Sequence, residues 1–264
     1  MTDIELLEPL IRIAEEAGAA ILEIYETDFD VELKDDHSPL TAADKAAHRL
    51  ICEALRELTP DMPVLSEESA AIPVAERRRW SRYWLVDPLD GTKEFIKKNG
   101  EFTVNIALVE GERPIAGVVH APVKRTTWLG VEDAGAFRKT TDGTAHITVE
   151  TPAADPVRVV CSRSHLDEKT ENFISRLGSH DAVATGSSLK FCLVAEGAAD
   201  IYPRFGPTSH WDTAAAHAVV AAAGGAVVTL DGEPLRYPVA ESLLNPPFLV
   251  YGDTNRDWLQ YLPA

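Results

Sequence analysis

The sequence has little positive charge and little cysteine. Its 264 residues include 25 Lys and Arg against 42 Asp and Glu, which gives a formal net charge of -17. Binding of a nucleic acid polymer requires a basic face, so this composition argues against such a partner. The three cysteines, Cys52, Cys161 and Cys192, lie far apart and form no C-x-x-C pair. A disulfide framework and a zinc site of that type are therefore not expected.

Long apolar runs and targeting segments are also missing. The longest apolar stretch, Ala218 to Leu230, is interrupted by Gly224 and Gly225 and is too short to cross a bilayer. The acidic N-terminus does not have the pattern of a signal peptide. We therefore expect a cytoplasmic protein without an integral membrane segment. Its length suits one or two domains around a sizeable core.

The most informative stretch is an apolar run that ends in two aspartates. Tyr83 to Val86 predicts a buried strand, and Asp87-Pro88-Leu89-Asp90-Gly91-Thr92 follows directly. Pro88 and Gly91 do not continue a strand, so we expect a turn here. Two carboxylates held this close repel each other, and a hard divalent cation removes the conflict. Backbone N–H groups and the hydroxyl after Gly91 can hold an anion, which indicates phosphate chemistry. The alternative is a turn in which both aspartates only cap the backbone.

Further acids stand at the ends of other predicted elements. Glu67 and Glu68 follow the short apolar run 63–65, so two strands that end in acids could bring them to one edge of a sheet. Asp44 has the position of a capping-box residue at the start of a helix. Asp212 begins an alanine-rich helix, where an acid is a favourable cap. On these patterns alone the glutamates also fit a solvated loop, and the two aspartates also fit plain caps.

The first half of the chain predicts two helices and then a sheet. Apolar residues at helical spacing indicate amphipathic helices over residues 3–26 and 41–58. From residue 102 to about residue 139, strands follow one another with short turns between them, as in an antiparallel sheet. The run Arg77-Arg78-Arg79 is interpreted as a solvated helix face.

The second half alternates between strands and helices. Residues 140–156 mark the expected boundary, so the predicted units are residues 1–150, an α+β unit with most of the candidate acids, and residues 151–264, an α/β unit that completes the site. The elements expected in the second unit are strand 157–161, helix 167–177, strand 182–185, helix 187–196, strand 200–202, helix 212–223, strand 226–230 and strand 248–251. Such alternation indicates an α/β fold class.

Three motifs combine into a more specific pattern: Ser66-Glu67-Glu68-Ser69, Asp87 to Thr92, and Trp211-Asp212-Thr213-Ala214-Ala215. In order and spacing, over nearly the whole chain, they resemble the lithium-sensitive, magnesium-dependent phosphatase superfamily that includes inositol monophosphatase. The sequence is more similar still to the CysQ-type 3'(2'),5'-bisphosphate nucleotidase family. The segments that carry this closer similarity are Tyr83 to Lys97, Asn99 to Leu108, Gly186 to Gly197 and Tyr202 to Thr208. Ala216 departs from the pattern, because relatives usually have glycine there, but the change removes no ligand.

The resemblance implies a fold, a cofactor and an activity. The fold would be a layered α/β/α/β/α sandwich with two or three Mg²⁺ ions. By motif position, the ligands would be Glu67, Asp87, Asp90, Asp212 and the backbone carbonyl of Leu89. The activity would be hydrolysis of adenosine 3',5'-bisphosphate to AMP and phosphate in support of sulfur assimilation. We expect a monomer or homodimer. The resemblance also implies the peripheral association at the inner face of the membrane that is described for relatives.

The implied mechanism is attack on phosphorus by a water molecule whose pKa the ions lower. Thr92, hydrogen-bonded to Asp44, would take or orient the proton of this water with the assistance of Glu67. Gly91 and Thr92 would hold the phosphate, and an ion near Asp212 would stabilise the leaving ribose oxygen. The residues expected to contact the second phosphate and the base are Ser187, Lys190 and Arg204, with Ser164 and His165 as weaker candidates.

Several alternatives remain open from sequence. Within the superfamily, the chain could instead be an inositol monophosphatase or a fructose-1,6-bisphosphatase. A haloacid-dehalogenase-type phosphatase would need Asp-x-Asp-Gly-Thr with a nucleophilic aspartate, but here Pro88 occupies the first aspartate position and Asp87 comes one residue too early. A sensor that binds the nucleotide without hydrolysing it would not require the pair Thr92 and Asp44.

Overall fold

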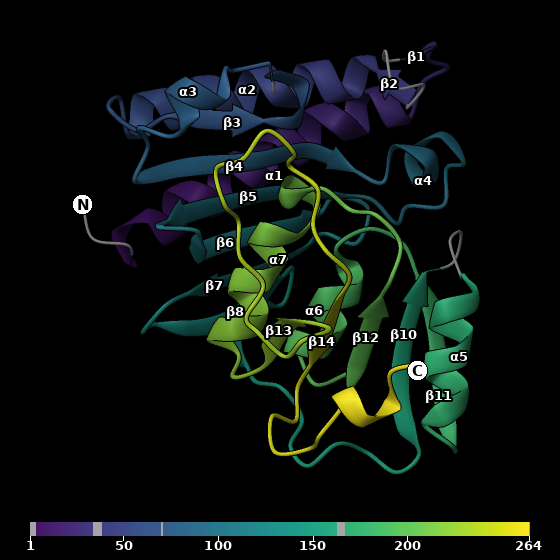
Figure 1. Ribbon diagram of the computed structural model, residues 1–264. Helices are drawn as coiled ribbons and strands as arrows, with labels where there is room; N and C mark the ends of the chain where they lie inside the picture. Colours follow the sequence, from purple (N-terminus) through teal and green to yellow (C-terminus); the bar gives the residue numbers. More distant parts are fainter. Residues whose placement is uncertain (1–3, 34–38, 70, 163–166, 264) are drawn as a thin grey trace.

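The computed structural model describes residues 4–33, 39–69, 71–162 and 167–263 (Figure 1). Helices and sheets alternate in layers: two helices, a seven-stranded sheet, two more helices, a five-stranded sheet and an outer helix. The predicted layered α/β/α/β/α sandwich is therefore confirmed.

The first layer packs two amphipathic helices on the outer face of the larger sheet. Its elements are η1 (Ile4–Leu6), α1 (Leu7–Tyr25), β1 (Val31–Leu33), β2 (Pro39–Thr41) and α2 (Ala42–Leu58). α1 buries Leu10, Ala14 and Ile21, and α2 buries Ala47 and Ile51. These residues recur at spacings of four and seven, which places them on one face of each helix. Both helices agree closely with the sequence prediction.

The seven-stranded sheet follows the chain order. Its strands are β3 (Val64–Ser66), β4 (Arg82–Asp90), β5 (Thr103–Glu110), β6 (Arg113–Ala121), β7 (Thr126–Val131), β8 (Gly135–Thr140) and β9 (Gly143–Ile147), paired in that order. All neighbours are antiparallel except β3 and β4, which are parallel. The short elements η2 (Glu67–Ser69), α3 (Val74–Arg77) and α4 (Thr92–Ile96) lie in the connections.

Two details of this half differ from the sequence prediction. The turn expected at Pro88 is a bulge, because β4 continues to Asp90 and its pairing with β5 shifts between Asp87 and Asp90. A bulge is one of the places where a sheet accepts proline, and the chain leaves the strand only at Gly91. Arg77 is only 5% exposed, so it does not belong to a solvated face; its Nε donates to the carbonyl of Ile72.

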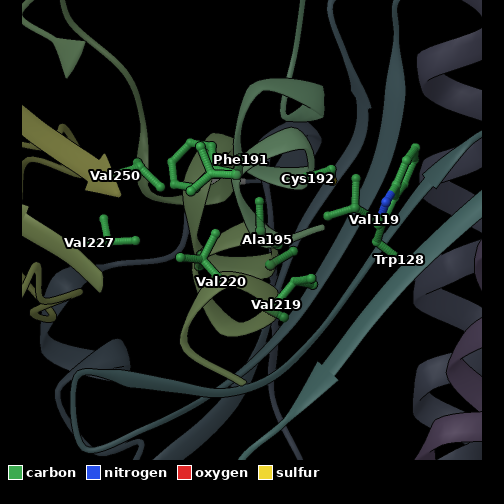
Figure 2. Packing of buried hydrophobic residues seen from close by; sticks show 14 of the residues in the cluster. Val119, Trp128, Phe191, Cys192, Ala195, Val219, Val220, Val227 and Val250 are labelled. Atoms are coloured by element: carbon green, nitrogen blue, oxygen red, sulfur yellow. The ribbon is translucent and has the colours of Figure 1, made fainter. Parts of the chain in front are cut away.

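Helices α6 (Leu189–Ala195) and α7 (His210–Ala222) separate the two sheets. Figure 2 shows their apolar side chains between Val119 and Trp128 of the larger sheet and Val227 and Val250 of the smaller one. Gly117 permits this approach, since a Cβ at that position would lie 2.2 Å from the carbonyl oxygen of Ala215. The position of α7 is thus fixed against β6 by contact of one backbone with the other.

The five-stranded sheet closes the second half. Its order is β11 (His180–Thr185), β10 (Val157–Ser162), β12 (Ile201–Arg204), β14 (Phe248–Tyr251) and β13 (Ala226–Thr229), with α5 (Glu168–Arg176) and η3 (Leu259–Tyr261) outside it. The expected elements are all present, with bounds that differ by two or three residues at most. The three cysteines are buried free thiols.

The change from one sheet to the other falls between residues 147 and 157, where the sequence places its boundary. One hydrophobic cluster nevertheless contains Leu85 from the first half and Val250 from the second, so the division into two domains stays a prediction. Among the residues described, none of the helices has the combined length and apolar character of a membrane-spanning segment.

Candidate active site

The candidate site lies at the end of β3, beside the bulge of β4. These strands are parallel, and Ser66, the last residue of β3, pairs with Val86, so Glu67 and Asp87 each follow a paired residue and lie at the same end of the sheet. The repeated strand-then-acid pattern of the sequence therefore brings acids from two segments together. Asp87 is 1% exposed, and its Oδ1 accepts the backbone N–H of Leu89 at 3.1 Å, which holds the carboxylate against the bulge.

Gly91 ends the strand and begins α4. Its φ of +94° lies in the left-handed region, and a Cβ there would lie 3.1 Å from the carbonyl oxygen of Glu101. Glycine is therefore favoured at this position both by backbone conformation and by space. The conformation turns Thr92 back toward the sheet edge, where its hydroxyl reaches the carbonyl oxygen of Leu89 at 3.3 Å.

Asp44 and Thr92 form the predicted pair. The Thr92 hydroxyl reaches Asp44 Oδ1 at 3.3 Å. The other oxygen, Oδ2, accepts the backbone N–H of Thr41 at 2.7 Å and its hydroxyl at 2.6 Å. Asp44 is thus both a capping residue of α2 and a partner of Thr92. The two interpretations that the sequence left open are compatible, because each uses a different carboxylate oxygen.

Asp90 ties the sheet edge to the segment before α6. Its Oδ2 accepts the Ser187 hydroxyl at 2.6 Å, the Ser188 backbone N–H at 2.7 Å and the Ser188 hydroxyl at 2.9 Å. Asn105 and Thr103 approach the same oxygen at 3.4 and 3.5 Å. Ser187 has φ of +55°, an uncommon conformation for serine. Residues from both halves therefore converge on one carboxylate.

Asp212 lies in the first turn of α7. Its Oδ2 accepts the backbone N–H of Ser209 at 2.8 Å, so it caps the helix as expected from its position. Its backbone carbonyl also accepts the Ser188 hydroxyl at 2.7 Å. The cap leaves the other carboxylate oxygen of Asp212 available to the cavity that this residue lines.

These groups line one cavity of about 310 Å³. The predicted residues that line it are Glu67, Asp87, Leu89, Asp90, Gly91, Thr92, Ser187, Lys190, Arg204 and Asp212. Asp44 is buried behind Thr92 and does not line it. Ser164 and His165 lie outside the described residues. The structure thus brings the predicted site residues to one place, while their individual roles stay predictions.

The carboxylates of the cavity disfavour one another's charge. The pKa of Asp87 is raised well above its usual value, first by burial and then by the charges of Glu67, Asp90 and Asp212. The pKa of Asp212 is also raised, first by burial and then by Asp90. An arrangement that penalises every added negative charge favours a bound cation.

The donor set suits Mg²⁺ in its chemistry. It consists of carboxylate oxygens and the carbonyl of Leu89, which are the ligands that hard cations prefer. In the described ranges, no three or more His, Cys, Asp or Glu side chains are gathered closely enough to hold an ion as they stand. One oxygen each of Asp90 and Asp212 is instead directed at protein donors. The ligand set therefore fits the cation by type, and its coordination geometry stays a prediction.

Cationic groups occupy another part of the cavity. Lys190 is 7% exposed; its Nζ donates to the carbonyl of Ser187 and lies 5.5 Å from the ring centre of Tyr202. Burial lowers the pKa of Lys190 to about 8. Arg204 donates through Nη2 to the carbonyl of Pro207 at 2.9 Å. Two cations beside a group of acids suit a substrate that carries more than one phosphate.

Sequence reasoning missed several residues of this site. Ser188 contacts Asp90 through two donors, and Asn105 donates to the Ser188 hydroxyl at 2.9 Å. Thr103 and Asn105 are buried polar residues at alternate positions of β5, whose other buried residues are apolar, and that pattern could have indicated a polar face. Lys93 and Glu94 also line the cavity; the sequence offered no signal beyond their nearness to Thr92.

Comparison with known proteins gives consistent results. The model of the inositol monophosphatase family matches residues 3–257. A 3'(2'),5'-bisphosphate nucleotidase CysQ of Escherichia coli K12 is 53% identical, over 93% of this chain and 99% of that protein. The crystal structure of CysQ from Bacteroides thetaiotaomicron has a TM-score of 0.83 and 45% identity, and covers 95% of this chain and 97% of that one. An IMPase from Thermotoga maritima has a TM-score of 0.80 at 25% identity, over 97% of this chain and 96% of the other.

Proposed function

The chain belongs to the inositol monophosphatase family, and on that basis we propose that it removes the 3'-phosphate of adenosine 3',5'-bisphosphate. The products are AMP and phosphate. The protein is an enzyme of the phosphoric monoester hydrolase class, like the bisphosphate nucleotidases that it resembles over most of its length. The observation that carries the substrate assignment is the cavity that combines clustered acids with Lys190 and Arg204. The proposed role of the reaction is to support sulfur assimilation.

The proposed cofactor is Mg²⁺, as two or three ions held by Glu67, Asp87, Asp90, Asp212 and the carbonyl oxygen of Leu89. When bound, Mg²⁺ neutralises phosphate oxygens and lowers the pKa of water. The mutual repulsion of the acids, seen in the raised pKa of Asp87, supports a cationic occupant. The same cation site is the place where Li⁺ would bind to inhibit the enzyme, as expected for a lithium-sensitive family.

Thr92 and Asp44 provide a path for a proton. The Thr92 hydroxyl lines the cavity and is within 3.3 Å of Asp44 Oδ1. Thr92 can therefore accept a proton from the attacking water while it passes its own proton to Asp44, with Glu67 assisting in orienting that water. The two donors of Thr41 fix the orientation of Asp44, so the acceptor stays in place during the transfer.

Lys190 and Arg204 are assigned to the second phosphate. Ser187 lies between these cations and the acids of the proposed metal site. Ser187 donates to Asp90, and its carbonyl accepts Lys190 Nζ, so one residue links an acid of the metal set to a cation. The backbone of Gly91 and Thr92 is assigned to the phosphate that reacts. Cytoplasmic location, peripheral membrane association and assembly as a monomer or homodimer stay predictions.

The assignment of Lys190 to the second phosphate is tested by comparing adenosine 3',5'-bisphosphate with 3'-AMP, which lacks that phosphate. Lys190→Met removes the charge with little change in volume, and Lys97→Met is a matched control at an exposed lysine. A charge-assisted hydrogen bond is worth about 1.5–3 kcal/mol, so we expect KM for the 3',5'-bisphosphate to rise at least tenfold in Lys190→Met. KM for 3'-AMP, which has one phosphate, should change less than twofold. An equal rise in KM for both substrates would show that Lys190 does not bind the second phosphate.

A further inference from the structure

A second cavity lies where α7 meets β6 and β7 of the larger sheet. Its volume is about 530 Å³, and it is formed by β6, β7, α7 and the segment 234–236. This volume is within the range of about 300–1,000 Å³ typical of small-molecule sites. The deep wall consists of buried apolar side chains: Ile115, Val131, Ala218 and Leu235. The cavity shares no lining residue with the candidate active site.

A buried imidazole lines this apolar cavity. His217 is 8% exposed, and its Nδ1 lies 3.0 Å from the Tyr237 hydroxyl oxygen. Tyr237 donates its own proton to Thr213 Oγ1 at 3.2 Å, and Thr213 donates to the carbonyl of His210 at 3.3 Å. Tyr237 is therefore left to accept from His217, which places the imidazole proton on Nδ1.

The other ring nitrogen of His217 is then a bare acceptor. Within the described part of the chain, Nε2 has no hydrogen-bond partner, and burial lowers the pKa of His217 to about 3, with Arg236 adding to the effect. The ring is thus neutral. Nε2 is not one of the buried side-chain atoms that lack a partner, so it is open to the cavity. An accessible acceptor beside an apolar wall suits a ligand that brings an N–H or O–H donor.

The charged residues that line this cavity are Arg113, Glu132, Asp133 and Arg236. Arg113 and Glu132 pair with each other at 2.8 Å, and Asp133 lies exposed in a turn. Arg236 has no ion pair or hydrogen bond with any described residue, and its charge reaches His217 closely enough to affect the pKa of that ring. Asp133 is not among the charges that act on His217, whereas Arg236 is, so the side of the cavity near this acceptor suits an anionic group.

α7 connects this cavity to the active site. His217 lines one cavity and Thr213 the other, and the hydroxyl of Tyr237 contacts both residues. Thr213 also accepts a hydrogen bond from Asn245, whose amide holds the carbonyl of Ser209 at 2.7 Å. A shift of His217 would therefore act on the turn that carries Asp212.

We propose that this second cavity is an effector site for a small organic acid that has a compact apolar body and one N–H or O–H donor. The donor meets Nε2 of His217, the acid group meets Arg236, and the apolar body fills the space against Ala218 and Leu235. Occupancy changes substrate binding through α7. The proposal does not depend on the identity of the substrate, because binding to the cavity can be measured without turnover.

The test uses 4-hydroxybenzoate, which carries both groups on a flat ring, and benzoate, which lacks the donor. Ligand-observed NMR and calorimetry on the whole protein should give a dissociation constant for 4-hydroxybenzoate of about 1 mM or tighter, a reasonable affinity for ten non-hydrogen atoms. Benzoate should bind at least fivefold more weakly. The same protein, saturated with 4-hydroxybenzoate, should show at least a twofold change in KM for the bisphosphate.

Variants locate the binding. Ala221 is exposed at the mouth of the cavity, so Ala221→Phe should block binding and Ala221→Ser should not. Arg236→Gln should weaken binding at least threefold, while Lys190→Met should leave it unchanged, which separates this cavity from the active site. Absence of binding at 10 mM, or equal binding to Ala221→Phe, would overturn the site. Binding without any change in KM would overturn its effector role.

Discussion

Asp90→Asn separates the catalytic role of this residue from its structural one. The oxygen Oδ2 accepts three short hydrogen bonds from Ser187 and Ser188, at 2.6, 2.7 and 2.9 Å. Asparagine can direct its carbonyl oxygen at these donors and its NH₂ group at the proposed ions. The variant would keep the acceptor that joins the two halves but lose the negative charge and the ligand.

The expected cost to stability is moderate. Hydrogen bonds to a charged acceptor are roughly twice as strong as neutral ones, so three weakened bonds amount to about 2–3 kcal/mol out of the roughly 5–15 kcal/mol of a typical domain. The expected cost to activity is larger. Losing Lewis-acid stabilisation of several kcal/mol corresponds to a rate loss of about a thousandfold, or roughly 4 kcal/mol.

The assay combines phosphate release at saturating Mg²⁺ with urea denaturation of the same preparation. Asp142→Asn, at an exposed turn, is the matched control and should behave as the unaltered protein in both. If Asp90→Asn kept more than a tenth of the activity, Asp90 would not be a metal ligand. If it failed to fold, the carboxylate charge would be the main link between the halves, and the moderate stability cost reasoned above would be wrong.

Three further predictions concern other parts of the site. Thr92→Ala should lower kcat about 100-fold with little change in KM, and Thr92→Ser should restore most of it, since general acid–base steps contribute about 10²–10⁴-fold; equal losses in both would contradict a role for the hydroxyl. Because burial lowers the pKa of Lys190 to about 8, KM for the bisphosphate should rise between pH 7 and 9 as the cation is lost, and a flat profile in steady-state kinetics would oppose this. The folded-state pKa lies below the usual value of 10.5, so the same group makes stability rise with pH between these two values. Asn245→Ala removes an amide that donates to three acceptors at 2.7–3.1 Å around the start of α7, so the free energy of unfolding should fall by about 2–3 kcal/mol in urea melts. The exposed control Asn172→Ala should change it by less than about 0.5 kcal/mol.

The helices and strands were largely predictable because their signals are local. The apolar spacing of α1 and the alternation of strands and helices after residue 157 both follow from the periods of the elements themselves. The bulge at Pro88 was not predictable in the same way, because it depends on how β4 pairs with β5. Likewise, Arg77 is buried, while its neighbours in a charged run suggested exposure.

The candidate site was predictable as a set of acids but not as a network. The strand-then-acid pattern places Glu67 and Asp87 at one edge, and parallel pairing of β3 and β4 agrees with it. The contacts of Ser188 with Asn105 and with Asp90 join residues more than 80 positions apart, and no local pattern encodes such a distance. For Asp44, the sequence could not decide between a helix cap and a functional group. In the structure one carboxylate oxygen caps α2 and the other accepts the Thr92 hydroxyl.

The most direct test of the central claim is phosphate release from adenosine 3',5'-bisphosphate and, in parallel, from inositol 1-phosphate. Both would be measured with Mg²⁺, and then with Li⁺ added. We expect fast release from the nucleotide that stops without Mg²⁺ and is inhibited by Li⁺, with little release from the inositol phosphate. Release mainly from inositol 1-phosphate would contradict the substrate assignment, and release from neither would contradict the assignment as a phosphatase and favour a nucleotide sensor.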